Sequence, residues 1–361
     1  MESNANSIVG AATGCVPNAV GATLALNPLE HADWDSLLNT NAASCFFHTQ
    51  AWCKVLHETY AHQPVYWSRL ADSRLQGLLP VMEVASPWTG RRGVSLPFTD
   101  ASGDLVCDAA ELYEDAREYG QQRSWKYMEF RGFRPPWPKA FPSLSFRQHI
   151  VELGEGPDVA FGNLEGAVRR GIRKAGNAGL RVEFNDSPAA IRIFYSLHCG
   201  TRRRHGVPPQ PLRFFENVAR FVFTAKQGFV VTAKLGERAV ASAVFFHWRD
   251  KAIYKFGASD YHFQHLRPNN LVMWEAIKKF SLEGFAQLDL GRTSLANVGL
   301  RRFKAGFGGR EQSLDYYKYD MHHRNFVADI DRAEGRINQF FRLLPGPLFR
   351  LAGCVLYPHL S

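Results

Sequence analysis

One order of sequence patterns occurs twice in this chain, and this repetition restricts its fold more than any other feature. In each half, two alternating apolar segments joined by a short polar turn predict a β-hairpin. A helical pattern and then a short apolar strand follow in both halves. The predicted elements cover residues 64–71, 75–84, 109–122 and 126–131 in the first half and 229–235, 239–248, 269–282 and 286–290 in the second.

The two halves also correspond at single positions. The strand after the helix carries one acid among apolar residues, Glu129 in the first half and Asp289 in the second. Residues 66–74 resemble residues 231–238 across the two hairpins. We therefore predict an α/β chain of two tandem domains, each with a mixed, mainly antiparallel sheet flanked by helices. Chance similarity of two hairpins is the alternative explanation.

The length of 361 residues suits two domains. We predict a disordered leader over residues 1–23, an N-terminal domain over 24–153, a C-terminal domain over 154–325 and a helical tail over 326–361. The second domain begins at a Gly-Glu-Gly-Pro linker. The tail mixes phenylalanines and leucines with arginines, so it either lies on a membrane surface or packs back on a domain.

Composition narrows the class of protein. The net charge of +9 favours an anionic partner, with an ordinary solvated surface as the alternative. The six cysteines are scattered and form no CxxC pair or Cys/His cluster, so neither a metal site, nor a disulfide framework, nor a redox cofactor is predicted. No run of 18 apolar residues occurs, and the N-terminus lacks the pattern of a signal peptide. We expect a cytoplasmic protein, free or peripheral at the inner face of the membrane.

Five segments carry a resemblance to a known family. Residues 195–208, 254–260, 267–277, 289–293 and 299–309 resemble the FemAB-like and BioF2-like acetyltransferases of the GNAT superfamily. The resemblance implies two fused GNAT-like domains that transfer an acyl or aminoacyl group to an amine or hydroxyl. It further implies an acceptor from peptidoglycan or exopolysaccharide synthesis, linked to a nucleotide or a lipid or present as a small molecule.

The loop before the second predicted helix concerns the acyl donor. A GNAT loop that binds the CoA pyrophosphate is rich in glycine, so that backbone N–H groups approach the phosphates. Residues 261–270 contain no glycine, and Pro268 removes a donor. This departure favours an aminoacyl-tRNA-like donor over acyl-CoA, and neither is expected to be a tightly bound cofactor. No DNA-binding motif occurs, and no heptad insertion of the kind some FemAB relatives carry is seen.

The candidate catalytic residues are Lys304, Phe303 and Asp289. Acyl transfer needs a group that stabilises the developing oxyanion, and Lys304 in the glycine-rich segment 299–309 is the electrostatic candidate. The resemblance implies that the Phe303–Lys304 pair lies at the transfer site. A surface lysine beside a tight turn is the alternative. Among the acids and histidines considered as a general base, Asp289 is expected instead to pair with Arg292, and His262 and His265 read as ordinary loop residues.

The candidate substrate contacts are polar side chains of the second half. Arg204 lies in a run of three arginines and matches the position where the family binds the phosphate of its acceptor, with a solvated basic turn as the alternative. Tyr254 is expected to point from a strand toward the same cleft. The full set is Arg204, Tyr254, Asp260, Asn270, Arg292 and Arg302.

Three functions stay open at this point. The first is a FemAB-like transferase acting on a cell-envelope or exopolysaccharide precursor. The second is a CoA-dependent N- or O-acetyltransferase. The third is a non-catalytic, degenerate GNAT pair that binds a nucleotide-linked or lipid-linked precursor.

Overall fold

The computed structural model describes residues 23–102, 105, 110–331 and 336–360. The leader predicted over residues 1–23 lies outside this part except for Thr23, which begins the first strand. The elements of the first half are β1 (Thr23–Leu26), α1 (Trp34–Leu38), η1 (Phe46–His48), α2 (Gln50–Tyr60), β2 (Gln63–Ala71), β3 (Arg74–Ser86), β4 (Gly90–Val94), α3 (Ala110–Gln122), β5 (Tyr127–Arg131) and β6 (Leu144–Glu152).

The second half is longer and richer in helix. Its elements are α4 (Pro157–Gly162), α5 (Gly166–Asn177), β7 (Leu180–Asn185), α6 (Pro188–His205), α7 (Leu212–Asn217), η2 (Val218–Phe223), β8 (Gly228–Leu235), β9 (Arg238–Trp248), β10 (Lys251–Ser259), η3 (Tyr261–Leu266), α8 (Pro268–Leu282), β11 (Gln287–Ser294), α9 (Val298–Ala305), β12 (Arg310–Asp320), β13 (Asn325–Phe326), α10 (Arg336–Leu343), α11 (Gly346–Leu356) and η4 (Tyr357–His359).

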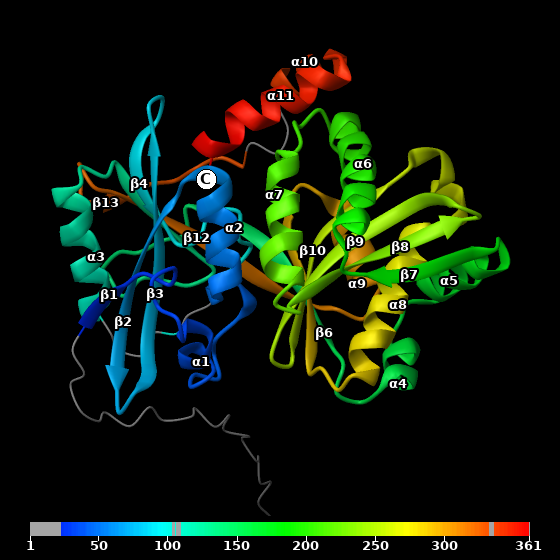
Figure 1. Cartoon of the computed structure of the whole chain (residues 1–361), viewed down its shortest axis with the longest axis horizontal. Coiled ribbons are helices and arrows are strands. Elements are labelled where there is room, and N and C mark those ends of the chain that lie inside the picture. Colours follow the sequence, from blue (N-terminus) through cyan, green and yellow to red (C-terminus); the bar gives the residue numbers. More distant parts are fainter. Residues whose placement is uncertain (1–22, 103–104, 106–109, 332–335, 361) are drawn as a thin grey trace, which may run out of the picture.

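All described strands join one sheet, in the order β1-β2-β3-β4-β5-β12-β6-β11-β10-β9-β8-β7, with β13 on β12. Only the pairs β4–β5 and β10–β11 are parallel within this described sheet. Figure 1 shows helices on both sides of this long sheet, with the two halves side by side. The predicted α/β class with a mainly antiparallel sheet is confirmed.

The duplication is visible in the strand register. In each half the third strand of a meander pairs in parallel with the strand that follows a helix, and Val94 faces Glu129 just as Ile253 faces Asp289. The two predicted acids therefore occupy equivalent positions in the sheet. The halves then exchange strands, because β12 of the second half pairs with β5, and β6 lies between β12 and β11.

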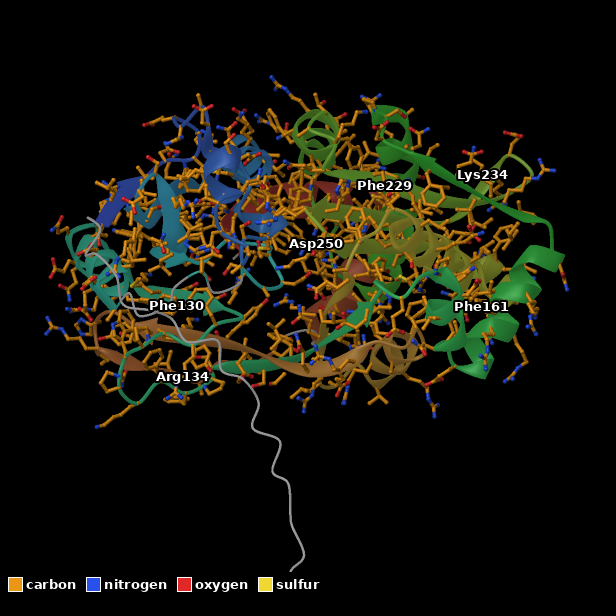
Figure 2. The ribbon with its side chains drawn as sticks, turned by 90° about the horizontal axis from the view of Figure 1, so that it is seen from below. Phe130, Arg134, Phe161, Phe229, Lys234 and Asp250 are labelled. Carbon is orange, nitrogen blue, oxygen red and sulfur yellow. The ribbon has the colours of Figure 1, made fainter. Side chains whose placement is uncertain are left out.

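Large apolar clusters fill the molecule. One cluster lies in the first half around Trp67 and Phe130, and another lies in the second half around Phe245 and Phe280. Figure 2 shows Phe130 in one half and Phe161 and Phe229 in the other. A third cluster bridges the halves, since the ring of Phe46 on η1 stacks at 4.4 Å on Phe246 of β9. This shared core fixes one half against the other.

The C-terminal helices pack back on the second half. The Cα of Gly206 lies so close to α10 that a Cβ would come within 2.0 Å of the Asn338 carbonyl oxygen. Likewise, a Cβ on Gly353 of α11 would meet the Pro209 carbonyl oxygen at 1.9 Å. Phe349 and Tyr357 are buried on the same inner side. In Figure 1, α10 and α11 lie across the upper ends of α6 and α7.

Candidate active site

The main cavity opens where two parallel strands separate. β10 and β11 are paired only from Lys251 to Ile253, opposite residues 287–289. Beyond Ile253, β10 has a register shift against β9, and β11 has one against β6 between Asp289 and Arg292. A cavity of about 770 Å³ lies in the opening, lined by residues 254–259 of β10 and 290–292 of β11. The edge of β10 that faces β11 there offers backbone groups to a ligand.

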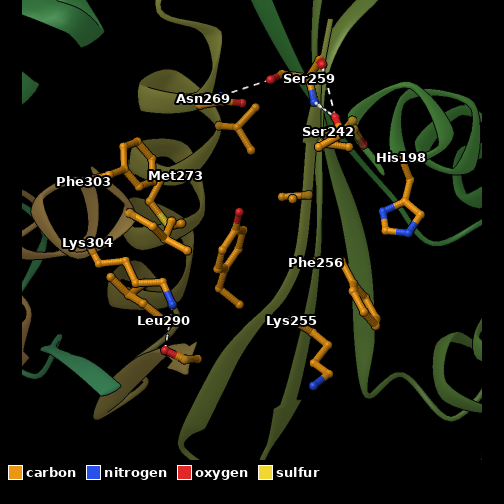
Figure 3. A pocket seen from close by; sticks show the side chains of 18 of the residues that line it. His198, Ser242, Lys255, Phe256, Ser259, Asn269, Met273, Leu290, Phe303 and Lys304 are labelled. Atoms are coloured by element: carbon orange, nitrogen blue, oxygen red, sulfur yellow. Dashed lines mark hydrogen bonds between the residues drawn. The ribbon is translucent and has the colours of Figure 1, made fainter. Parts of the chain in front are cut away.

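Lys304 reaches this cavity from the helix α9, whereas the alternative interpretation had a surface lysine beside a tight turn. Its side chain is buried, and its Nζ donates to the carbonyl oxygens of Gly291 at 2.7 Å and Arg292 at 3.1 Å. Burial lowers the pKa of Lys304 to about 8. The alternative of a surface lysine is therefore wrong. Figure 3 shows Phe303 and Lys304 together on one side of the cavity.

Asp289 lies behind the cavity wall. It binds the backbone N–H of Gly291, the residue whose carbonyl oxygen accepts from Lys304. Its carboxylate accepts from the N–H of Gly291 at 2.7 Å and from Gln148 Nε2 at 2.5 Å. Burial raises the pKa of Asp289 to about 6. The expected pairing of Asp289 with Arg292 is a prediction that we correct. The bulge in β11 turns Arg292 away, toward Asp100.

Asp100 and Lys255 belong to the cavity and were not predicted. Lys255 Nζ donates to Asp100 Oδ2 at 3.1 Å, and Arg292 Nε lies 3.9 Å from the other oxygen of the same carboxylate. Burial lowers the pKa of Lys255. Asp100 comes from the first half, and Tyr316 on β12 fixes its loop by donating to the Asp100 carbonyl oxygen at 2.6 Å. A lysine inside the apolar strand 252–257 was the available sequence signal.

The opposite wall carries the predicted Arg204 and Tyr254. Arg204 lies in the last turn of α6, so the basic run belongs to a helix rather than to a solvated turn. Its guanidinium lies over the Tyr261 ring at 5.6 Å, and both Arg204 and Tyr254 line the cavity. Burial raises the pKa of Tyr254 to about 12. The Tyr254 hydroxyl packs against the backbone of Gly257, so a side chain at residue 257 would displace the Tyr254 ring.

A second cavity, of about 700 Å³, lies on the other side of Phe303. Its lining contains four cations, which are Arg170 and Lys174 on α5, Arg267 before α8 and Arg302 on α9. Asn270 also lies here. Among the described residues, Glu165 is the only acid in the lining. Phe303 and Gly299 line both cavities, so the two form adjoining compartments.

Asp260 is not among the residues that line either cavity. One oxygen caps η3 by accepting from the N–H of His262, and the other pairs with Arg238 at 2.8 Å. Its role as a substrate contact stays a prediction that this position does not support. The glycine-free loop folds as η3 and ends at Arg267 with a φ of 63°, directly before Pro268 at the start of α8. It provides no glycine cradle for a pyrophosphate.

The comparisons with known proteins agree with this geometry. Residues 163–305 match the family model described as an acetyltransferase (GNAT) domain. This segment contains every lining residue of both cavities except Asp100. Residues 163–305 are thus similar to a GNAT acetyltransferase domain, and the solved structures described next share the fold of most of the chain. No curated protein sequence is significantly similar to it.

Three solved structures describe the shared fold. FemX is 13% identical, covers 81% of this chain and 96% of its own, and has a TM-score of 0.64. A structure described as the C-terminal domain of a lysylphosphatidylglycerol synthetase from Agrobacterium fabrum is 14% identical, with coverages of 74% and 86% and a TM-score of 0.52. A tandem GNAT protein from the clavulanic acid biosynthesis pathway is 9% identical, with coverages of 83% and 98% and a TM-score of 0.52.

The described residues show neither a metal cluster nor a membrane-spanning helix. Within the described ranges, no group of three or more His, Cys, Asp or Glu side chains is placed to hold a metal ion. Of the helices that the structure describes, none combines the length and the apolar character needed to cross a bilayer. The acyl donor of a GNAT domain is a substrate rather than a resident cofactor.

Proposed function

We propose that this chain transfers an acyl or aminoacyl group to an amine or hydroxyl of a cell-envelope or exopolysaccharide precursor. The observation that carries the proposal is the buried Lys304 in the wall of the cavity between β10 and β11. We further propose that residues 24–153 and 154–325 are two domains that together enclose the site. The tail over 326–361 is a separate element.

The chemistry requires stabilisation of negative charge. The acceptor's lone pair attacks the donor's carbonyl carbon, and the carbonyl oxygen gains charge before the thiolate or alkoxide leaves with the acceptor's proton. An ammonium has three donors, and Lys304 uses two of them on the carbonyls of Gly291 and Arg292. The third is free to donate to the oxyanion. Phe303 beside it separates the reacting group from the second cavity.

The donor is proposed to place its anionic part in the second cavity. Arg170, Lys174, Arg267 and Arg302 line this cavity, and Glu165 is the only acid among its described lining residues. The glycine-free loop favours the ribose-phosphate end of an aminoacyl-tRNA over a CoA pyrophosphate. An acyl-CoA is the second candidate, because the open edge of β10 suits an extended amide-containing chain.

The acceptor is proposed to enter past Arg204, whose guanidinium suits a phosphate of a lipid-linked or nucleotide-linked precursor. A lysylphosphatidylglycerol synthetase among the structures with this fold supports an acceptor of the envelope. With such an acceptor, we propose a cytoplasmic protein in peripheral contact with the inner face of the membrane through its tail. If the protein binds a precursor but transfers no group in an assay, it is instead a non-catalytic GNAT pair that binds this precursor.

The first test is thermal stabilisation by acetyl-CoA, longer acyl-CoAs, aminoacyl-tRNA and UDP-linked sugars. A ligand present at about 100-fold its Kd is expected to stabilise the fold by about 2–3 kcal/mol. The double variant Arg170→Glu/Arg302→Glu should lose the stabilisation by the donor but keep that by the acceptor. The control variant Arg220→Glu changes an exposed arginine away from both cavities and should behave like the wild type. Donor stabilisation that survives the double variant contradicts the proposed donor site.

A further inference from the structure

The outer side of the C-terminal helices is apolar and exposed. Leu348, Leu351 and Val355 follow one another along the outer face of α11, opposite the buried Phe349 and Gly353. On α10, Phe340 is 60% exposed and Leu343 is 82% exposed. A helix that is apolar on both faces is ordinarily covered on both. The inner face of α11 is covered by the second half, and within the described chain nothing buries the outer one.

The charge of this region has a single sign. Residues 336–361 contain arginines but neither aspartate nor glutamate. Arg342 and Arg350 are exposed beside the apolar side chains. Leucines and phenylalanines next to arginines, without acids, are the composition of helices that lie in the interface of anionic membranes.

A residue of the first half completes the same surface. Trp88, in the turn between β3 and β4, is 62% exposed, and its ring lies 4.1 Å from that of His359. Arg92 of β4 donates to the His359 carbonyl oxygen at 2.7 Å and so fixes this contact. The exposed cations Arg91 and Lys126 lie beside this turn. Tryptophan with nearby cations is characteristic of the water–membrane boundary.

We propose that these side chains form one docking surface for an anionic phospholipid bilayer. We call it the tail surface and define it as Trp88, Phe340, Leu343, Leu348, Leu351 and Val355. The arginines at its rim select the bilayer as the occupant, since they attract anionic headgroups while the apolar side chains enter the acyl boundary. A second copy of the chain would bring the same arginines together without a matching acid.

The helices that carry the tail surface pack with their inner side against the wall of the main cavity. Arg202 of α6 lines the cavity and donates to the Tyr357 hydroxyl at 2.6 Å, which ties the cavity wall to the tail. α10 lies directly on Gly206, the residue that ends α6. Docking therefore brings Arg204 and the cavity close to the lipid headgroups. If the proposed function holds, the acceptor is a lipid-linked precursor that the site reaches from the membrane. Only this step rests on the proposed function.

Sedimentation with vesicles tests the tail surface without donor or acceptor, so that its outcome is independent of catalysis. The full chain is expected to bind vesicles of phosphatidylglycerol in phosphatidylcholine and to bind pure phosphatidylcholine at least about tenfold more weakly. Leu348→Asp/Leu351→Asp should reduce the affinity at least about tenfold, and Arg350→Ala should reduce it about fivefold. Trp88→Ala should weaken binding as well.

The matched control is Leu282→Asp, which changes an exposed leucine at the end of α8 and should leave binding unchanged. Circular dichroism melting checks that each variant is folded, which is expected because the changed side chains are exposed. Absence of binding to either vesicle overturns the proposal, and so does equal binding by Leu348→Asp/Leu351→Asp. A wild-type dimer that this double variant splits, without vesicle binding, assigns the surface to a second copy instead.

Discussion

At the scale of single residues, the decisive feature is a lysine that stays largely protonated although it is buried. Two carbonyl oxygens accept from Lys304, and burial opposes its charge, which leaves its pKa at about 8. Asp100 favours the charged form from across the cavity, and the neighbouring Lys255 opposes it. The amine is therefore an ammonium at neutral pH and a neutral base only above about pH 8.

The pH dependence of kcat/KM separates these two forms of Lys304. Lys304 loses its proton as the pH rises through about 8. If the ammonium form stabilises the oxyanion, kcat/KM should therefore fall above that pH. The residual rate of Lys304→Met should lack this alkaline fall. A wild-type rate that continues to rise through pH 9 would instead identify neutral Lys304 as a general base.

The sequence predicts part of this site and misses the part built by distant contacts. Lys304, Phe303, Arg204, Tyr254 and Arg292 do line the main cavity, because they lie in segments that keep the pattern of a known family. Asn270 and Arg302 line the second cavity. Asp100 was missed because nothing local connects the loop after β4 with β10. Asp260 lies outside the lining of both cavities, and its ion pair with Arg238 joins residues that are not adjacent in sequence.

At the scale of elements, a bulge in β11 links Asp289 to Lys304. Gly291 has a φ of 73°, and this turn lets its N–H reach Asp289 while its carbonyl accepts from Lys304. The conformation favours glycine, and a Cβ would also lie 3.1 Å from Asp100 Oδ2 and 3.2 Å from the Tyr254 carbonyl oxygen. The bulge is thus part of the device that positions the ammonium.

Gly291→Ala tests the bulge against Gly284→Ala as its matched control. Gly284 has a φ of 78° but no heavy atom within 4 Å of an added Cβ, so its substitution reports backbone strain alone. Both variants should lose about 1–2 kcal/mol of unfolding free energy in urea titrations. Only Gly291→Ala should also lower kcat, by about tenfold or more. Equal activity of the two variants would show that the bulge does not position Lys304.

The elements themselves were predicted unevenly. The hairpins, α3, α8 and the strands after them follow from local periodicity and turn residues, and they occur close to the expected ranges. The strands β6 and β12 were not predicted from local sequence, because their place in the sheet is set by pairing between distant parts of the chain. α9 was missed because the glycines around it read as a turn, although Asn297 caps the helix by accepting from the N–H of Leu300.

At the scale of the whole molecule, the site depends on both halves together. Asp100 reaches the cavity from the first half, and Lys255, Arg292 and Lys304 come from the second. The crossing strands β6 and β12 and the apolar cluster around Phe46 and Phe246 hold these groups in place. A duplicated fold that has exchanged strands therefore acts as one rigid frame around one site.

Product formation is the measurement that decides whether this frame transfers an acyl group with the help of Lys304. With the donor that stabilises the wild type, product from an amine or hydroxyl acceptor should be measured for the wild type and Lys304→Met, after melting confirms that both are folded. If the Lys304 ammonium stabilises the oxyanion, Lys304→Met binds the donor with unchanged affinity and loses about 100-fold or more in kcat. A folded Lys304→Met enzyme with the wild-type kcat, or a wild type that binds donor and acceptor but forms no product, would contradict this proposal.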